Sequence, residues 1–153
     1  MRLFALLIGF LLSGTALAAS EQVPSDLAAV SAKAGLEGPF AKWCRSEFRS
    51  GHPGAFAVAV PSNNRGGRYL VVETSGTTFP LASYSGRPDL ACYSPAEARK
   101  LNDTIARTDT VNGRVEPLWS TTVICGFVEE THAVCWQYSP TENSFVNVGE
   151  WAT

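Results

Sequence analysis

The sequence predicts an α+β fold with a mostly antiparallel sheet of about five to seven strands, N-terminal helices, one inserted helix and disulfide bonds. Three observations lead to this prediction. Apolar residues recur at helical spacing before residue 50, and beyond it they alternate with polar ones over much of the chain. Four cysteines follow a segment that is typical of export. Hydrophobic residues make up 45% of the chain and charged residues 17%, which favours a folded domain over disorder.

The first 18 residues are typical of a secretory signal peptide. Arg2 supplies a positive charge, Leu3–Leu12 is an apolar run, and Ala16-Leu17-Ala18 is a small-residue cleavage site. The run is shorter than the ~20 apolar residues that a membrane span needs, and no later segment approaches that length. We therefore expect residues 1–18 to be removed and residues 19–153 to form a single domain, either in the periplasm or secreted.

The cysteines predict two disulfide bonds. An even number in an exported chain is typical of a disulfide framework, and this chain has Cys44, Cys92, Cys125 and Cys135. Their spacing lacks the two closely spaced pairs of a zinc site, so we predict neither a metal site nor a cofactor. Sequence proximity favours a bond between the last two cysteines, which leaves the first two as the other pair.

The segment Thr121–Pro140 tests that pairing, because it reads as a hairpin with one cysteine in each strand. A three-residue turn, Glu129–Thr131, places the two cysteines opposite each other. A four-residue turn, Glu129–His132, directs the sulfurs to opposite faces and prevents the bond. A three-residue turn usually contains a left-handed position, for which threonine is a poor choice. Turn chemistry therefore disagrees with proximity.

Two helices are predicted before the first strand. Val23–Gly35 is rich in alanine, and Ser25 or Asp26 can cap its first turn. A second helix is predicted to begin at Pro39. The apolar residues that follow fall at i, i+3, i+4 and i+8, and they are Phe40, Trp43, Cys44 and Phe48.

Strands are predicted by apolar alternation at residues 54–60, 68–74, 79–84, 90–93, 119–128, 132–138 and 145–151. Ala57 and Ala59 share one face of the first strand, which predicts a closely packed helix there. Pro80 places its strand at a sheet edge. Asn112-Gly113 predicts a tight hairpin between residues 110–111 and 114–115.

The inserted helix has the clearest start signal. Ser94 is a cap residue, Pro95 takes the first helical position, and Glu97 can reach back to the cap N–H group as in a capping box. The helix is predicted to end near Arg107, a cation that suits the negative end of the helix dipole.

Two loops carry the candidate binding residues. Arg65 and Arg68 flank two glycines and could cradle an anion, with Arg87 nearby. The other loop holds the tightest group of titratable side chains, namely Glu129, Glu130 and His132. This group suits general acid–base chemistry or weak cation binding, and a solvated turn has the same composition.

The chain lacks the motifs of the common catalytic classes, which makes an enzyme the less favoured reading. The chain has no G-x-S-x-G, H-E-x-x-H, P-loop or G-x-G-x-x-G pattern. Its formal net charge of −2 gives no general attraction to nucleic acid or anionic lipid. We therefore expect a non-catalytic binding protein whose partner is an envelope or extracellular protein, with enzyme inhibition as one form of that role.

The alternative is a carbohydrate-binding module or a small glycan hydrolase, with a glycan as the ligand. Its aromatic residues would be Trp119, Trp136, Tyr138 and Trp151. Its carboxylates would come from Glu73, Glu116 and Glu150. Core packing explains the same aromatic residues equally well. A purely structural envelope or secreted component is the third reading of the sequence.

Overall fold

The strands form two antiparallel sheets, where the sequence predicted one. The computed structural model describes residues 22–62, 65–107 and 113–152. The first sheet has the order β1-β2-β3-β4, and its strands are Lys42–Ser46, Ala55–Ser62, Gly66–Val72 and Thr78–Ser85. The second has the order β5-β7-β8-β9-β6. Its strands in chain order are Leu90–Tyr93, Arg114–Val115 (β6), Val123–Glu129, His132–Ser139 and Ser144–Ala152.

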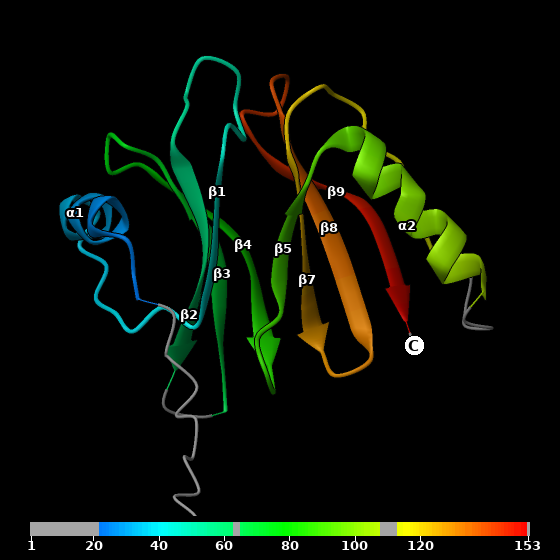
Figure 1. The fold of residues 1–153 in the computed structure, drawn as a ribbon, viewed down its shortest axis with the longest axis horizontal. Helices are drawn as coiled ribbons and strands as arrows, with labels where there is room; N and C mark the ends of the chain where they lie inside the picture. The colour runs from blue at the N-terminus through cyan, green and yellow to red at the C-terminus, as the bar shows by residue number, and fades with distance from the viewer. Residues whose placement is uncertain (1–21, 63–64, 108–112, 153) are drawn as a thin grey trace, which may run out of the picture.

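Two helices cover the outer faces of the sheets, so the domain has four layers (Figure 1). Helix α1, Ser25–Lys33, packs on the first sheet, and helix α2, Pro95–Arg107, packs on the second. A third cluster of buried side chains fills the space between the sheets. The overall α+β class is therefore confirmed, with more residues in strands than in helices.

The two faces of β2 pack against different parts of the structure. Phe56 and Val58 face α1, while Ala57 and Ala59 face the second sheet. The prediction that a helix packs on the alanine face is wrong. Small side chains on that face instead make room for the large rings between the sheets, which belong to Tyr69, Tyr84 and Trp136.

The second predicted helix is also wrong, because its residues form β1. The backbone of β1 pairs with β2 over its whole length. Trp43 packs in the α1 cluster, whereas Cys44 packs between the sheets and is bonded to Cys92 of β5. Pairing with β2 and a cross-link to the other sheet outweigh the helical spacing, since tertiary context routinely overrides local preference.

Several local predictions are confirmed. The Glu97 N–H donates to Ser94 Oγ at 3.2 Å and the Ser94 N–H donates to Glu97 Oε2 at 2.8 Å, which completes the capping box of α2. Pro80 lies in β4, an edge strand. Helix α1 is present, but Pro24 occupies its cap position and no side chain caps it.

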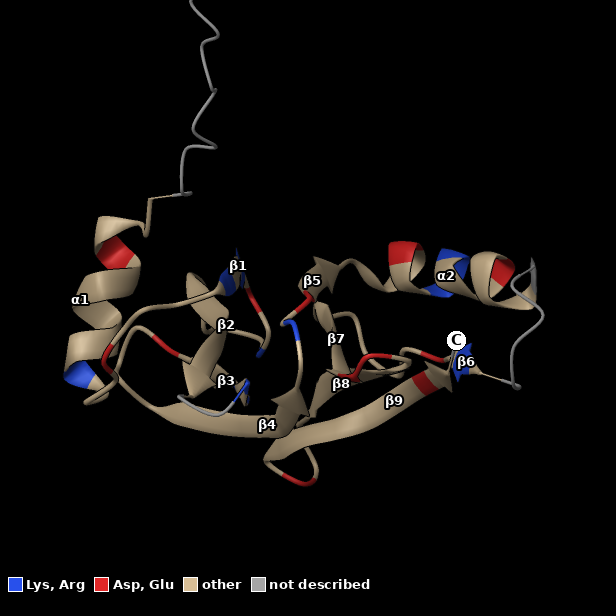
Figure 2. Cartoon of the chain, turned by 90° about the horizontal axis from the view of Figure 1, so that it is seen from below, with Lys and Arg blue, Asp and Glu red and all other residues tan. Residues whose placement is uncertain are grey.

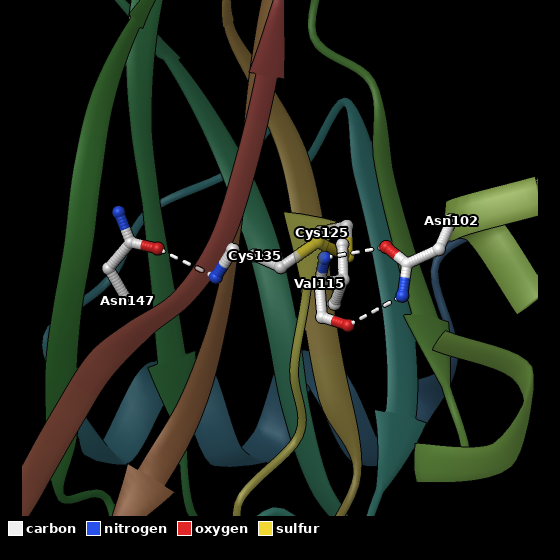
Figure 3. The surroundings of a disulfide bond; sticks show 6 residues. Asn102, Val115, Cys125, Cys135 and Asn147 are labelled. Carbon is white, nitrogen blue, oxygen red and sulfur yellow. Dashed lines mark hydrogen bonds between the residues drawn. A yellow bond between two sulfur atoms is a disulfide. The ribbon is translucent and has the colours of Figure 1, made fainter. Parts of the chain in front are cut away.

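Some predictions fall outside the described residues. The predicted signal peptide, residues 1–18, is one of them, and the hairpin turn at Asn112 with its first strand at 110–111 is another. The second strand of that hairpin is β6, which pairs with β9. Asn102 of α2 binds Val115 of β6 through two hydrogen bonds of 2.7 and 2.9 Å beside the disulfide (Figure 3).

Both predicted disulfides are present. Cys125 lies opposite Cys135 in the register of β7 and β8, and the two are bonded. A bulge follows Phe127, so that Glu129 pairs with His132 and the turn contains only two residues. The bulge therefore resolves the conflict between proximity and turn chemistry. Among the described residues, only Arg65 and Asn143 are non-glycine residues with positive φ, so the turn needs no left-handed threonine.

A buried ion pair ties loops together at one end of the sandwich. Arg49, in the β1–β2 loop, donates to both carboxylate oxygens of Glu73 at 2.8 and 2.6 Å, and Glu73 is 3% exposed. The Arg49 guanidinium also lies 5.6 Å from the ring centres of Phe79 and Tyr138. His52 Nδ1 lies 3.1 Å from the same guanidinium.

We expect Arg49→Met to lower the free energy of unfolding by about 3 kcal/mol, because it leaves the Glu73 carboxylate buried without its partner. The double variant Arg49→Met/Glu73→Gln should lose less than the sum of the two single changes. Urea denaturation followed by tryptophan fluorescence measures both quantities. Arg45→Met is the matched control, since its pair with Asp26 is exposed and should contribute about 1 kcal/mol or less. Equal losses for Arg45→Met and Arg49→Met would contradict the assignment.

Candidate functional site

Three turns that are far apart in the sequence meet at the other end of the sandwich, which we call the loop end. They are the β2–β3 connection at Arg65, the β4–β5 turn at Gly86–Asp89 and the β7–β8 tip at Glu130, and they lie at the bottom of Figure 1. The Gly86 N–H donates to the Arg65 carbonyl at 2.8 Å. A Cβ atom added to Gly86 would lie 3.5 Å from Glu130 Cγ. The β4–β5 turn therefore lies close to both of the other turns.

A cavity of about 420 Å³ opens at the loop end. Its lining residues come from β1, the β4–β5 turn and the β7–β8 hairpin, and they are Lys42, Arg87, Pro88, Asp89, Phe127 and Glu130. A smaller cavity of about 50 Å³ shares Asp89 and Phe127 with it and is also lined by Tyr93 and Trp151. The larger volume lies in the range of small-ligand sites, about 300–1,000 Å³.

The charged groups of this cavity have no partner within the described part of the chain. Lys42, Arg87, Asp89 and Glu130 are all exposed, and none of their side chains makes a salt bridge or a hydrogen bond there. Figure 2 looks onto the loop end and shows basic and acidic stretches beside each other near β1, β5 and β8. Both signs of charge are therefore available to a ligand.

Tyr69 of β3 fixes the turn that carries two of these groups. Its hydroxyl donates to the Phe127 carbonyl at 2.8 Å and accepts from the Asp89 N–H at 3.2 Å. The Phe127 N–H in turn donates to the Asp89 carbonyl at 3.1 Å. Burial raises the pKa of Tyr69 to about 12. These bonds hold the Asp89 backbone against β7, so its carboxylate is presented from a fixed position.

The arginines of the first predicted site are separated. Arg87 lines the cavity, and Arg65 contributes its carbonyl to the contact with Gly86. Arg68 lies on β3 and lines a different cavity of about 440 Å³, together with Leu36 and Pro80. The glycines between Arg65 and Arg68 allow close packing, because a Cβ atom at Gly67 would lie 2.5 Å from the Tyr84 hydroxyl. Arg68 therefore does not join Arg87 at the loop end.

The second predicted group is divided as well. Glu130 lines the cavity. His132 Nε2 instead lies 3.4 Å from Glu150 Oε2 on β9. Glu129 pairs with His132 through the backbone register and is exposed. Of the six predicted binding residues, Arg87 and Glu130 are thus the two that share one cavity.

Four of the cavity residues were not predicted as site residues from the sequence. Lys42 fell within the wrongly predicted helix, and Phe127 looked like an ordinary strand residue. Pro88 and Asp89 lay between two predicted strands, but no local pattern indicated that the Asp89 carboxylate would be free. The register of the β7–β8 hairpin and the fold of the β4–β5 turn bring these residues together, and neither is visible in a local motif.

The aromatic residues and carboxylates of the alternative reading do not share a common surface. Trp136 is buried between the sheets, Trp119 packs in the α2 cluster, and Tyr138 contacts Arg49 at the opposite end. The three carboxylates are divided among different partners. Glu73 pairs with Arg49, Glu116 with Arg114 and Glu150 with His132.

Neither α1 nor α2 is long and apolar enough to cross a bilayer, and this finding concerns the described residues only. In the same part of the chain, no three His, Cys, Asp or Glu side chains come together as metal ligands. Comparison of the chain with protein-family models, curated proteins and solved structures finds no match.

We expect the stability of the protein to fall as the pH rises from 10 toward 12. The unfolded chain releases the Tyr69 proton near pH 10, whereas the folded chain holds it until about pH 12. Stability that is fully present below pH 10 is therefore lost above it, by about 2–3 kcal/mol from this residue. Urea denaturation across this range measures the loss.

Tyr69→Phe is the comparison for that experiment. It removes the titrating group together with the hydroxyl's hydrogen bonds, so the variant should be less stable at neutral pH and lose less above pH 10. Parallel curves for the two proteins above pH 10 would show that Tyr69 does not carry the effect.

Proposed function

We propose that this chain is a small exported binding protein that captures a protein partner, in the periplasm or outside the cell, with its loop end and without catalysis. The observation that carries the proposal is the cavity of about 420 Å³ with its unpartnered charges. These charges come from β1, the β4–β5 turn and the tip of the β7–β8 hairpin. Charged groups without intramolecular partners are free to pair with complementary groups on another molecule, and such pairs contribute to specificity and association rate.

The two disulfide bonds, which cross-link the strands next to the loop end, support this role. Cys44–Cys92 joins an edge strand of one sheet to an edge strand of the other, and Cys125–Cys135 joins the two strands of the hairpin that carries Glu130. A binding site that is already ordered loses less conformational entropy when its partner binds. Capture of an enzyme, with inhibition as the result, is one form of the same role.

The test is capture of partners by the immobilised oxidised protein from envelope and culture fractions. We expect Arg87→Ala/Glu130→Ala to abolish retention of a partner that the unmodified protein retains. The matched control is Lys100→Gln/Asp103→Asn, which changes the same number of exposed charges on α2, away from the cavity. If both double variants retain the same proteins, the loop end is not the binding surface.

One observation favours the glycan alternative. The smaller cavity combines a carboxylate, Asp89, with the aromatic side chains of Tyr93, Phe127 and Trp151. Aromatic faces beside polar groups suit sugar rings, and the Phe127 and Trp151 rings meet edge to face at 6.3 Å.

We expect a glycan ligand to shift the tryptophan fluorescence saturably and the shift to disappear in Trp151→Phe. Titration with a panel of cell-wall and other polysaccharides measures this effect. Trp119→Phe is the control, because Trp119 does not line that cavity. No change across the panel would count against the alternative and leave the protein-binding proposal standing.

A further inference from the structure

The cavity at the loop end combines side chains of both signs of charge with two apolar side chains. Its two cations, Lys42 and Arg87, and its two carboxylates, Asp89 and Glu130, are unpaired within the described residues. A simple anion would leave the carboxylates unmatched and would be repelled by them, and a simple cation would meet the same difficulty with Lys42 and Arg87. The complementary ligand is therefore one that carries both charges.

Phe127 and Pro88 supply the apolar part of the lining, and both are half-buried. An aromatic ring attracts a cationic head group that lies over its face, and an aliphatic stem packs on the same surface. Asp89 lines both cavities together with Phe127, and its backbone N–H is held by Tyr69, so its carboxylate projects from a fixed backbone position in the same cavity. This combination suits the side chain of arginine or lysine.

The opposite charge of the ligand must lie close to the basic side chain, because all four charged groups line one cavity of about 420 Å³. The C-terminal residue of a polypeptide meets that condition when it is arginine or lysine, since one residue then supplies both a cation and a carboxylate. Arginine forks pair strongly with carboxylates, and capture of a C-terminal carboxylate is a recurring mode of peptide recognition.

From this geometry we propose that the cavity binds the C-terminal residue of a polypeptide that ends in arginine or lysine. The basic side chain lies on Phe127 and pairs with Asp89 and Glu130, while the terminal carboxylate pairs with Arg87 and Lys42. This inference rests on the proposed binding function and names the chemical group that the loop end recognises.

The experiment uses isothermal titration calorimetry with the oxidised protein and three N-acetylated peptides. The first has three glycines followed by a C-terminal arginine, the second is its C-terminal amide, and the third ends in glutamine instead of arginine. We expect saturable binding of the first peptide. The other two should bind about fivefold more weakly, the upper end of what one exposed charge pair contributes.

Two variants assign each charge of the peptide to its partner. Arg87→Gln should weaken the first peptide part of the way to the level of the amide, because Lys42 remains, and should leave the amide unchanged. Asp89→Asn should weaken the first peptide part of the way to the level of the glutamine peptide, because Glu130 remains, and should leave that peptide unchanged. Lys100→Gln/Asp103→Asn should bind like the unmodified protein. Circular dichroism shows that each variant keeps its fold.

Equal binding of the three peptides, or no saturable heat for the first, would overturn this inference. Either result leaves the binding function intact if partner capture still depends on Arg87 and Glu130. The reverse result is also possible. If the peptide binds but capture of proteins does not depend on Arg87 and Glu130, the proposed protein partner is overturned and recognition of a C-terminal basic residue is retained. The two experiments can therefore fail independently.

Discussion

The packing of large rings between the two sheets is the interaction on which the rest of the structure depends. Tyr69 stacks on Tyr84 with ring centres 4.6 Å apart and lies 6.0 Å from Trp136. Alanines of β2 and a glycine in each sheet make room for these rings, because a Cβ atom at Gly67 or Gly126 would lie 3.0 Å or less from one of them. Tyr69 also binds the β4–β5 turn, so the same side chain supports both the core and the candidate site.

The two ends of the sandwich use their charged residues differently. At one end Arg49 and Glu73 are paired, and the Arg49 guanidinium lies near the rings of Phe79 and Tyr138. The charges there stabilise the contact between loops. At the loop end the charges line a cavity without partners in the described residues. A charge without an intramolecular partner contributes little to folding, so the charges at the loop end remain available to pair with another molecule.

The two disulfides also differ in what they constrain. Cys44–Cys92 spans the sheets, with its Cα atoms 6.1 Å apart and a sequence separation of 48, so it restricts a long loop of the unfolded chain. Cys125–Cys135 lies within one hairpin, below α2. Together with Tyr69 they fix the strands and the turn from which most of the cavity residues project.

The sequence alone determined the features that depend on neighbours along the chain. The capping box of α2 and the edge position of Pro80 are of this kind, and so are most of the strands. Sequence proximity also favoured the observed disulfide pairing, although turn chemistry disagreed until the structure showed the bulge after Phe127. In each case the deciding contact lies within a few residues, or the number of alternatives is small.

Only the tertiary structure decided the rest. Residues 39–50 have helical spacing, but β1 forms there because pairing with β2 and the bond to Cys92 satisfy its backbone and its cysteine together. The division into two sheets, and the meeting of Lys42 and Asp89 at one cavity, also depend on contacts between distant segments. Such contacts are set by the summed packing of the whole domain, and no local pattern of residues contains that information.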